Sequence, residues 1–146
     1  MRAARAIVAF GLTGCAVQAY DGPRRATKDV ALIETDGTNL TGVDDWNANG
    51  SKLEVLPGMH ALSVRLDDSH RQTAGSSDGY RYFSMGAVVV CFVAHAGHTY
   101  EARPVYAGRS WRPEIVDESR AELVRSWVVD SPAGRCTTGS GRERTE

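Results

Sequence analysis

The chain has 146 residues, of which 42% are hydrophobic and 24% charged, with 17 basic and 18 acidic side chains. This is the length of one ordinary domain, and the hydrophobic fraction supplies enough material for a core, which excludes a wholly disordered chain. The near balance of charge gives no basic surface of the kind that nucleic-acid-binding proteins present, so we expect no nucleic-acid partner.

The first fourteen residues have the layout of a secretory signal. Two arginines near the start are followed by a short apolar run at residues 6–12 (AIVAFGL), and the small residues Thr13 and Gly14 then precede Cys15. A helix that spans a bilayer needs about 20 apolar residues. The run is far shorter, so it predicts export and not a transmembrane segment.

The residues Leu12-Thr13-Gly14-Cys15 resemble a bacterial lipobox. The resemblance implies that a diacylglyceryl group is added to the Cys15 thiol, that residues 1–14 are removed, and that the new amine is acylated. Ala16 rather than aspartate follows the cysteine, which in Gram-negative lipoproteins implies the outer membrane, facing the periplasm. The bilayer would then be a partner through acyl chains, each buried CH₂ adding about 0.8 kcal/mol. The alternative is a degraded helix start with an incidental cysteine.

The remaining chain divides into a tether, a domain and a tail. In residues 15–28 the Gly22-Pro23 pair breaks any helix and three basic side chains keep the chain solvated, so we expect a flexible tether after the lipidated Cys15. Residues 29–130 are expected to form the folded domain. Residues 131–146 are rich in Gly, Ser, Thr and Arg and predict a loose polar tail.

The first half of the domain alternates short apolar runs with turn signals. Asn-Gly within residues 47–51 (NANGS) predicts a turn, and Pro57-Gly58 predicts a second, tight turn. In residues 60–66 hydrophobic and polar residues alternate cleanly, which is typical of a half-buried strand. Strands are predicted over residues 30–33, 40–46, 52–56 and 60–66.

The second half opens with a polar loop at residues 67–79. The valine-rich run within residues 80–95 predicts a central strand covered on both faces. Pro104, late in the strand predicted at residues 99–106, indicates an edge position there. Further strands are predicted over residues 111–116 and 123–129, with a short helix over residues 118–127 as the alternative.

About seven short strands with frequent turns predict an all-β fold. We expect a small antiparallel β-sandwich or partly open barrel, following a cleaved lipoprotein signal peptide.

Two stretches of the domain carry a second resemblance. The sequences VLPGMHALSVRL and AHAGHTYEA, which begin at Val55 and Ala94, are similar to the Pro-Gly turn and the AGH-Y hairpin of small proteobacterial outer-membrane lipoproteins of unknown function. The Pro-Gly turn is also similar to PEGA-type and transthyretin-like sandwich modules. The resemblance implies an envelope location and a β-sandwich, and it implies no activity.

Cys91 and Cys136 are the pair that remains if Cys15 is lipidated. In an oxidising periplasm two thiols form a disulfide where geometry allows, and this one would close a loop of about 45 residues and stabilise the fold by roughly 3–4 kcal/mol. The alternative is that Cys91 is a small buried hydrophobic residue and Cys136 a free thiol in the tail.

Three histidines are candidate metal ligands. His95 and His98 flank a turn and His60 begins the strand after Pro57-Gly58, so the three imidazoles would suit Zn²⁺ or Cu²⁺ if they met. The alternative is that each histidine bonds the backbone and packs against a neighbour such as Tyr100.

Signals for catalysis are weak. The sequence has no G-x-S-x-G motif, and the adjacent acid pairs Asp44-Asp45 and Asp67-Asp68 lie at turns, where aspartate is expected in any case. We therefore expect no enzyme and no cofactor. The predicted function is a membrane-anchored, periplasm-facing lipoprotein that has a structural role or binds an envelope protein, peptide or glycan, with a periplasmic metal-binding protein as the alternative.

Overall fold

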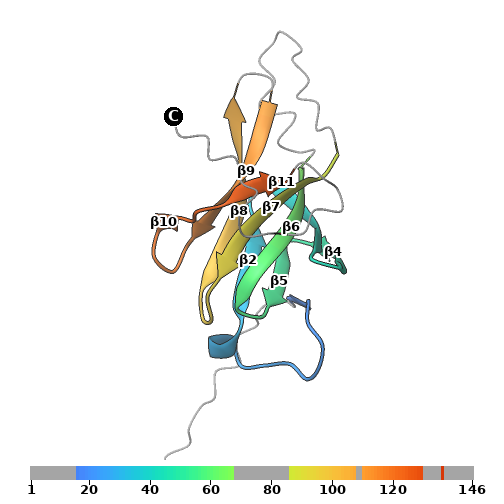
Figure 1. Cartoon of the computed structure of the whole chain (residues 1–146), viewed down its shortest axis with the longest axis vertical. Coiled ribbons are helices and arrows are strands. Elements are labelled where there is room, and N and C mark those ends of the chain that lie inside the picture. The colour runs from blue at the N-terminus through green and yellow to red at the C-terminus, as the bar shows by residue number, and fades with distance from the viewer. Residues whose placement is uncertain (1–15, 68–85, 108–109, 130–135, 137–146) are drawn as a thin grey trace, which may run out of the picture.

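The computed structural model describes residues 16–67, 86–107, 110–129 and 136, and these form strands joined by turns (Figure 1). The elements are β1 (Val17–Gln18), the 3₁₀ helix η1 (Thr27–Asp29), β2 (Ala31–Thr35), β3 (Thr38–Val43), β4 (Trp46–Gly50), β5 (Lys52–Val55), β6 (Gly58–Leu66), β7 (Val88–Ala94), β8 (Thr99–Ala107), β9 (Ser110–Asp117), β10 (Glu122–Leu123) and β11 (Trp127–Val129). In this part of the chain no helix has the length and apolar character that a membrane span requires.

The strands form two sheets. One sheet has the order β1-β5-β2-β8-β9-β10 and the other the order β11-β7-β6-β3-β4. β3 lies over β2 and β8, and β7 lies over β9, so the sheets face each other with the core between them. The predicted all-β sandwich is confirmed. Because the described residues hold eleven strands, the predicted number of about seven is too low.

Two strand pairs depart from the antiparallel arrangement that the sequence predicts. β1 pairs parallel with β5, and β2 pairs parallel with β8. The reason is that β5 and β8 each follow a strand of the other sheet, β4 and β7, so that no hairpin with β1 or β2 sets their direction. The other strand pairs of the described residues are antiparallel.

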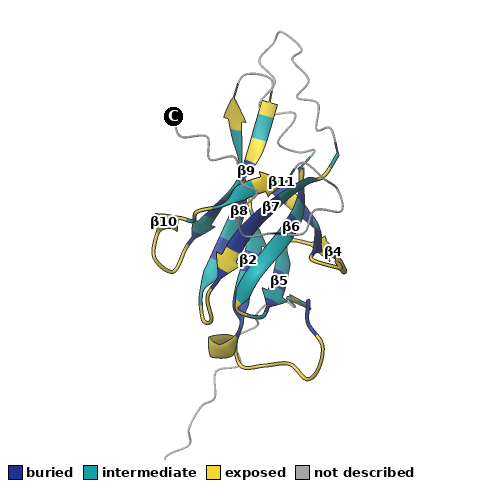
Figure 2. Ribbon diagram, in the orientation of Figure 1, coloured by how far each residue is buried: buried dark blue, intermediate teal, exposed yellow. Residues whose placement is uncertain are grey.

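The core is built from the inward-facing residues of both sheets (Figure 2). The alternation predicted for residues 60–66 is confirmed, since Leu62 and Val64 are fully buried and Leu66 is 3% exposed. Val90 and Phe92 of β7 are likewise fully buried. Burial of one such side chain contributes about 1.5–3 kcal/mol relative to its exposure, so the central strands of each sheet dominate the stability.

The turn predicted at residues 47–51 is wrong, because these residues lie largely in β4. The chain turns instead at Asp44-Asp45, where Asp44 adopts a left-handed φ of 50°. Aspartate tolerates this conformation better than most residues. Just before the turn, a Cβ on Gly42 would lie 3.0 Å from the carbonyl oxygen of Trp46, so this close approach favours glycine at that position.

Two further connections differ from the sequence prediction. The sequence predicts a tight turn at Pro57-Gly58. In the structure this connection leads from β5 in one sheet to β6 in the other, with Gly58 at a φ of 134°. The strand predicted over residues 123–129 is split into β10 in one sheet and β11 in the other. The alternative helix over residues 118–127 does not form.

Pro104 lies in the part of β8 that has one neighbouring strand among the described residues. β2 pairs with β8 only as far as Ala102, so beyond that residue β8 is bordered among the described strands by β9 alone. Pro104 lies opposite Pro113 of β9, and neither residue can donate to the ladder. The predicted edge position is therefore correct for this end of β8, although β8 as a whole lies inside its sheet.

Candidate functional site

The segment at residues 16–24, which follows Cys15, is the first candidate functional feature. β1 begins at Val17, so Ala16 is the only residue between Cys15 and the first strand. Val17 is paired with Leu53 and Gln18 with Glu54, and the amide of Ala19 donates to the carbonyl of Glu54 at 2.9 Å. The chain that follows Cys15 therefore pairs, from Val17 onward, with the edge of β5.

Side chains reinforce this junction. The guanidinium of Arg24 donates to both carboxylate oxygens of Glu54, with its shortest contact at 2.6 Å, and also to the carbonyl of Ala16 at 3.3 Å. The Gln18 amide donates to the carbonyls of Tyr20 and Gly22. Tyr20 is 5% exposed.

The flexible tether expected over residues 15–28 is therefore wrong for its first described part, residues 16–24. Pairing with β5, burial and side-chain bonds hold it against the domain. The sequence offered no signal for this, because the partners lie thirty or more positions away along the chain.

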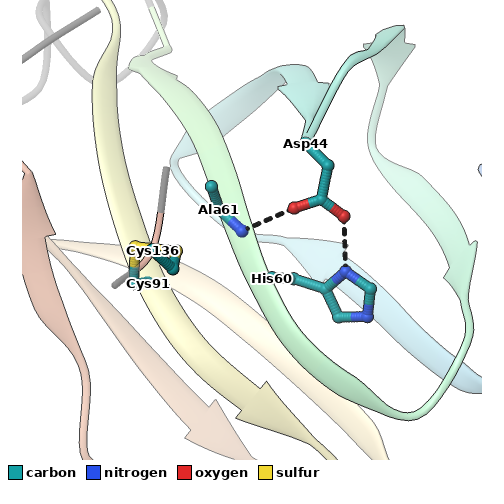
Figure 3. The surroundings of a disulfide bond; sticks show 5 residues. All are labelled: Asp44, His60, Ala61, Cys91 and Cys136. Carbon is teal, nitrogen blue, oxygen red and sulfur yellow. Dashed lines mark hydrogen bonds and ion pairs between the residues drawn. A yellow bond between two sulfur atoms is a disulfide. The ribbon is translucent and has the colours of Figure 1, made fainter. Parts of the chain in front are cut away.

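The predicted bond between Cys91 and Cys136 is present in the structure (Figure 3). The two Cα atoms lie 5.7 Å apart and the residues are 45 positions apart in sequence. Cys91 is fully buried in β7, which lies beside β6 in its sheet. Of the tail at residues 131–146, only Cys136 is described, and it is held covalently to the sheet.

His60 is held between two acceptor oxygens. Its Nδ1 lies 2.7 Å from Oδ2 of Asp44, and its Nε2 lies 2.6 Å from the carbonyl oxygen of Leu56. The other carboxylate oxygen of Asp44 accepts the amide hydrogen of Ala61 at 2.9 Å (Figure 3). Both neighbours of the imidazole can only accept, so the ring satisfies both when it carries two protons.

The electrostatics of this pair agree with its geometry. Burial by itself lowers the pKa of His60, but the bonds to Asp44 and Leu56 outweigh it, and the pKa is raised above its ordinary value. Burial would likewise raise the pKa of Asp44, yet its bonds to His60 and Ala61 hold that pKa below the ordinary value. The ion pair joins the β3–β4 turn, the start of β6 and the segment that leaves β5.

A second histidine–carboxylate pair lies at the turn between β7 and β8. Nδ1 of His98 is 2.7 Å from Oδ2 of Asp117, which is 5% exposed, and Oδ1 of Asp117 accepts the amide of Ser119 at 3.0 Å. The ring of His98 stacks on Tyr100, and the Tyr100 hydroxyl accepts the amide of His95 at 2.8 Å. Burial raises the pKa of the Tyr100 hydroxyl. These contacts fix the turn and its aromatic neighbours.

The three candidate metal ligands are not brought together as one site. The rings of His95 and His98 lie 5.7 Å apart between centroids, whereas both ring nitrogens of His60 are engaged by Asp44 and Leu56. Among the residues that the structure describes, no group of three or more His, Cys, Asp or Glu side chains is arranged to hold a metal ion. In this arrangement each histidine bonds or packs locally, which was the alternative interpretation.

Sequence reasoning missed the two aspartates that anchor these histidines. Asp44 was noted only as a turn residue, and its partners His60 and Ala61 lie 16 and 17 positions away. Asp117 gave no signal, because a buried acid at the end of a strand cannot be distinguished by sequence from an exposed one. Asp68, the partner of Asp67 in the second acid pair, lies outside the described residues.

The chain matches no protein-family model, no curated protein and no solved structure in the three comparisons with known proteins.

Proposed function

We propose that this protein is a lipid-anchored envelope protein, acylated at Cys15 and facing the periplasm from the outer membrane. The observation that supports the proposal best is the use of the three cysteines. Cys91 and Cys136 are joined, as expected in an oxidising compartment. Cys15 stands outside this bond, at the end of a basic and apolar leader and one residue before β1.

The domain itself has a structural or binding role in this proposal. The two histidine–carboxylate pairs, His60 with Asp44 and His98 with Asp117, hold turns and strands together. Apolar side chains remain exposed elsewhere, with Leu123 at 63% and Val128 at 44%. These features favour a scaffold that contacts a protein, peptide or glycan over a catalytic centre. Crosslinking in intact cells followed by co-purification would identify such a partner.

Metabolic labelling tests the anchor. The full chain is expressed in a Gram-negative host that is fed an alkyne-tagged fatty acid, and membrane fractions are compared for wild type, Cys15→Ala and Cys136→Ser. We expect label and outer-membrane recovery for wild type and Cys136→Ser, and neither for Cys15→Ala. Equal labelling of all three proteins, or of none, would contradict the proposal.

A further inference from the structure

The distance between Cys15 and the domain is limited by covalent geometry. Consecutive Cα atoms lie about 3.8 Å apart, so the Cα of Cys15 is within about 7 Å of the Cα of Val17. The headgroup layer on each side of a bilayer is itself about 5–7 Å thick. If acyl chains on Cys15 enter the hydrocarbon region, Val17 at the start of β1 must therefore lie close to the membrane surface.

The contacts of residues 16–24 keep this segment against β5 and so keep the distance between Cys15 and the domain short. Arg24 holds the carbonyl of Ala16, which is the last residue before Cys15, and the same guanidinium is fixed to Glu54. Ala19 is hydrogen-bonded to β5 and 7% exposed. Release of the segment would break the β1–β5 pairing together with these bonds.

The topology identifies which other strand shares this side of the sandwich. β3 lies over β2 and β8, and β7 lies over β9. β4, the strand beyond β3, therefore lies on the side of β5 and β1, and only Ser51 separates β4 from β5 along the chain. In Figure 1 β4 and β5 are seen on the side opposite β10.

Two apolar side chains are exposed on this side, which we call the β1–β4 edge (Val17–Gln18 and Trp46–Gly50). Val17 is 42% exposed and Trp46 is 40% exposed. Tryptophan is favoured at the membrane–water interface because its ring is apolar and its N–H finds polar partners there. The opposite edge of the same sheet, β10, lies five strands away, or about 24 Å at ordinary strand spacing.

We propose that the acylated protein rests on the lipid headgroups with its β1–β4 edge, so that its strands run along the membrane and β10 lies farthest from it. This orientation rests on the proposed lipidation of Cys15. The occupant of the edge is the surface of the lipid bilayer in which the acyl chains are inserted.

The orientation is measured with fluorophores on single introduced cysteines. With Cys15 acylated and Cys91 bonded to Cys136, the new residue supplies the thiol for labelling. Asn49→Cys on the β1–β4 edge and Glu122→Cys on β10 are both at exposed positions. The purified lipoprotein is reconstituted in phosphatidylcholine vesicles that contain a headgroup spin-labelled lipid. We expect the label at position 49 to be quenched at least about twofold more than that at position 122, because the headgroup layer is only about 5–7 Å thick whereas the two edges of the sheet lie about 24 Å apart. Equal quenching would overturn the orientation.

A spacer variant tests whether the short connection between Cys15 and β1 causes the orientation. Insertion of ten Gly-Ser residues after Ala16 adds a reach of roughly 17 Å without changing the domain, and it should make the quenching at the two positions equally weak. A difference that persists with the spacer would overturn the role of the short junction. The acyl mass of each sample keeps the two proposals distinct. An absent acyl group refutes the anchor, whereas equal quenching in an acylated sample refutes only the orientation.

Discussion

Arg24 and Glu54 are thirty residues apart in sequence, yet their side chains are joined at 2.6 Å at the edge where the chain enters the domain. The same guanidinium holds the carbonyl of Ala16. The pair therefore helps to hold residues 16–24, which the sequence predicts to be part of a flexible tether, against the edge of the sheet.

Arg24→Ala should loosen this segment and leave the domain folded. Arg24 is 54% exposed, and exposed ion pairs contribute about 0–1 kcal/mol, so we expect little change in the midpoint of chemical unfolding. The amide of Ala19, which donates to Glu54, should exchange with deuterium faster. Arg25→Ala is the matched control and should leave this exchange rate unchanged. Unaltered exchange in Arg24→Ala would contradict the role of the pair.

Loss of the Cys91–Cys136 bond should destabilise the domain substantially. For a loop of 45 residues the loss is roughly 3–4 kcal/mol in the free energy of unfolding. Urea unfolding of a Cys91→Ala/Cys136→Ala double variant, with wild type measured with and without reductant, gives this value. Cys15→Ser should respond to the reductant as wild type does. A reductant that leaves the unfolding midpoint of wild type unchanged would show that the bond contributes nothing.

The His60–Asp44 pair should make stability depend on pH. Since the pKa of folded His60 is raised above 6.5, its contribution is complete below that pH and is lost as the pH rises through the folded pKa. The lowered pKa of Asp44 acts in the acid range, where its contribution is present above 3.8 and is lost as the pH falls through the folded pKa.

The contribution of His60 to the pH dependence of stability is measured with His60→Gln, because glutamine does not titrate. Between about pH 6 and about pH 9, wild type should lose more thermal stability than His60→Gln, because only wild type loses the second ring proton. Asp45→Asn, at the exposed neighbour of Asp44, should retain the wild-type decline. The same pH dependence in His60→Gln as in wild type would argue against a doubly protonated ring.

Two residues that face each other in register should respond very differently to truncation. Leu53 and Val17 are paired between β5 and β1, but Leu53 is fully buried whereas Val17 is 42% exposed. Leu53→Ala should cost about 2–5 kcal/mol, as expected for a cavity in a packed core. Val17→Ala should lower the free energy of unfolding by well under about 1 kcal/mol. Similar losses for both variants would place Val17 in the core.

Local patterns predicted those parts of the fold that depend on neighbouring residues. The alternation of Leu62 and Val64 marks an inward-facing strand because strand side chains have a period of two. The Asn-Gly signal misplaced the hairpin because the turn is fixed elsewhere, by Asp44 and the amide of Ala61 seventeen residues away. At Gly58 the sequence predicts an unusual φ, and the structure has one. The sequence does not predict that the chain crosses there to the other sheet, because this depends on the arrangement of both sheets.

The residues of the candidate site likewise divide into those that the sequence predicts and those that depend on distant partners. The pairing of Cys91 with Cys136 followed from their number and from the expected compartment. The roles of Arg24 and Asp117 depend on partners that only the folded chain brings close. The alternative of a histidine metal cluster does not arise among the described residues. Both ring nitrogens of His60 are bonded to Asp44 and Leu56, and Nδ1 of His98 is bonded to Asp117.

Lipidation of Cys15 is tested most directly by the intact mass of the mature protein purified from membranes, compared with that of Cys15→Ala. We expect a wild-type chain that begins at Cys15, carries acyl groups and lacks residues 1–14, and a variant that carries no acyl mass. A wild-type protein that retains residues 1–14, or that has lost them without gaining acyl mass, would contradict it.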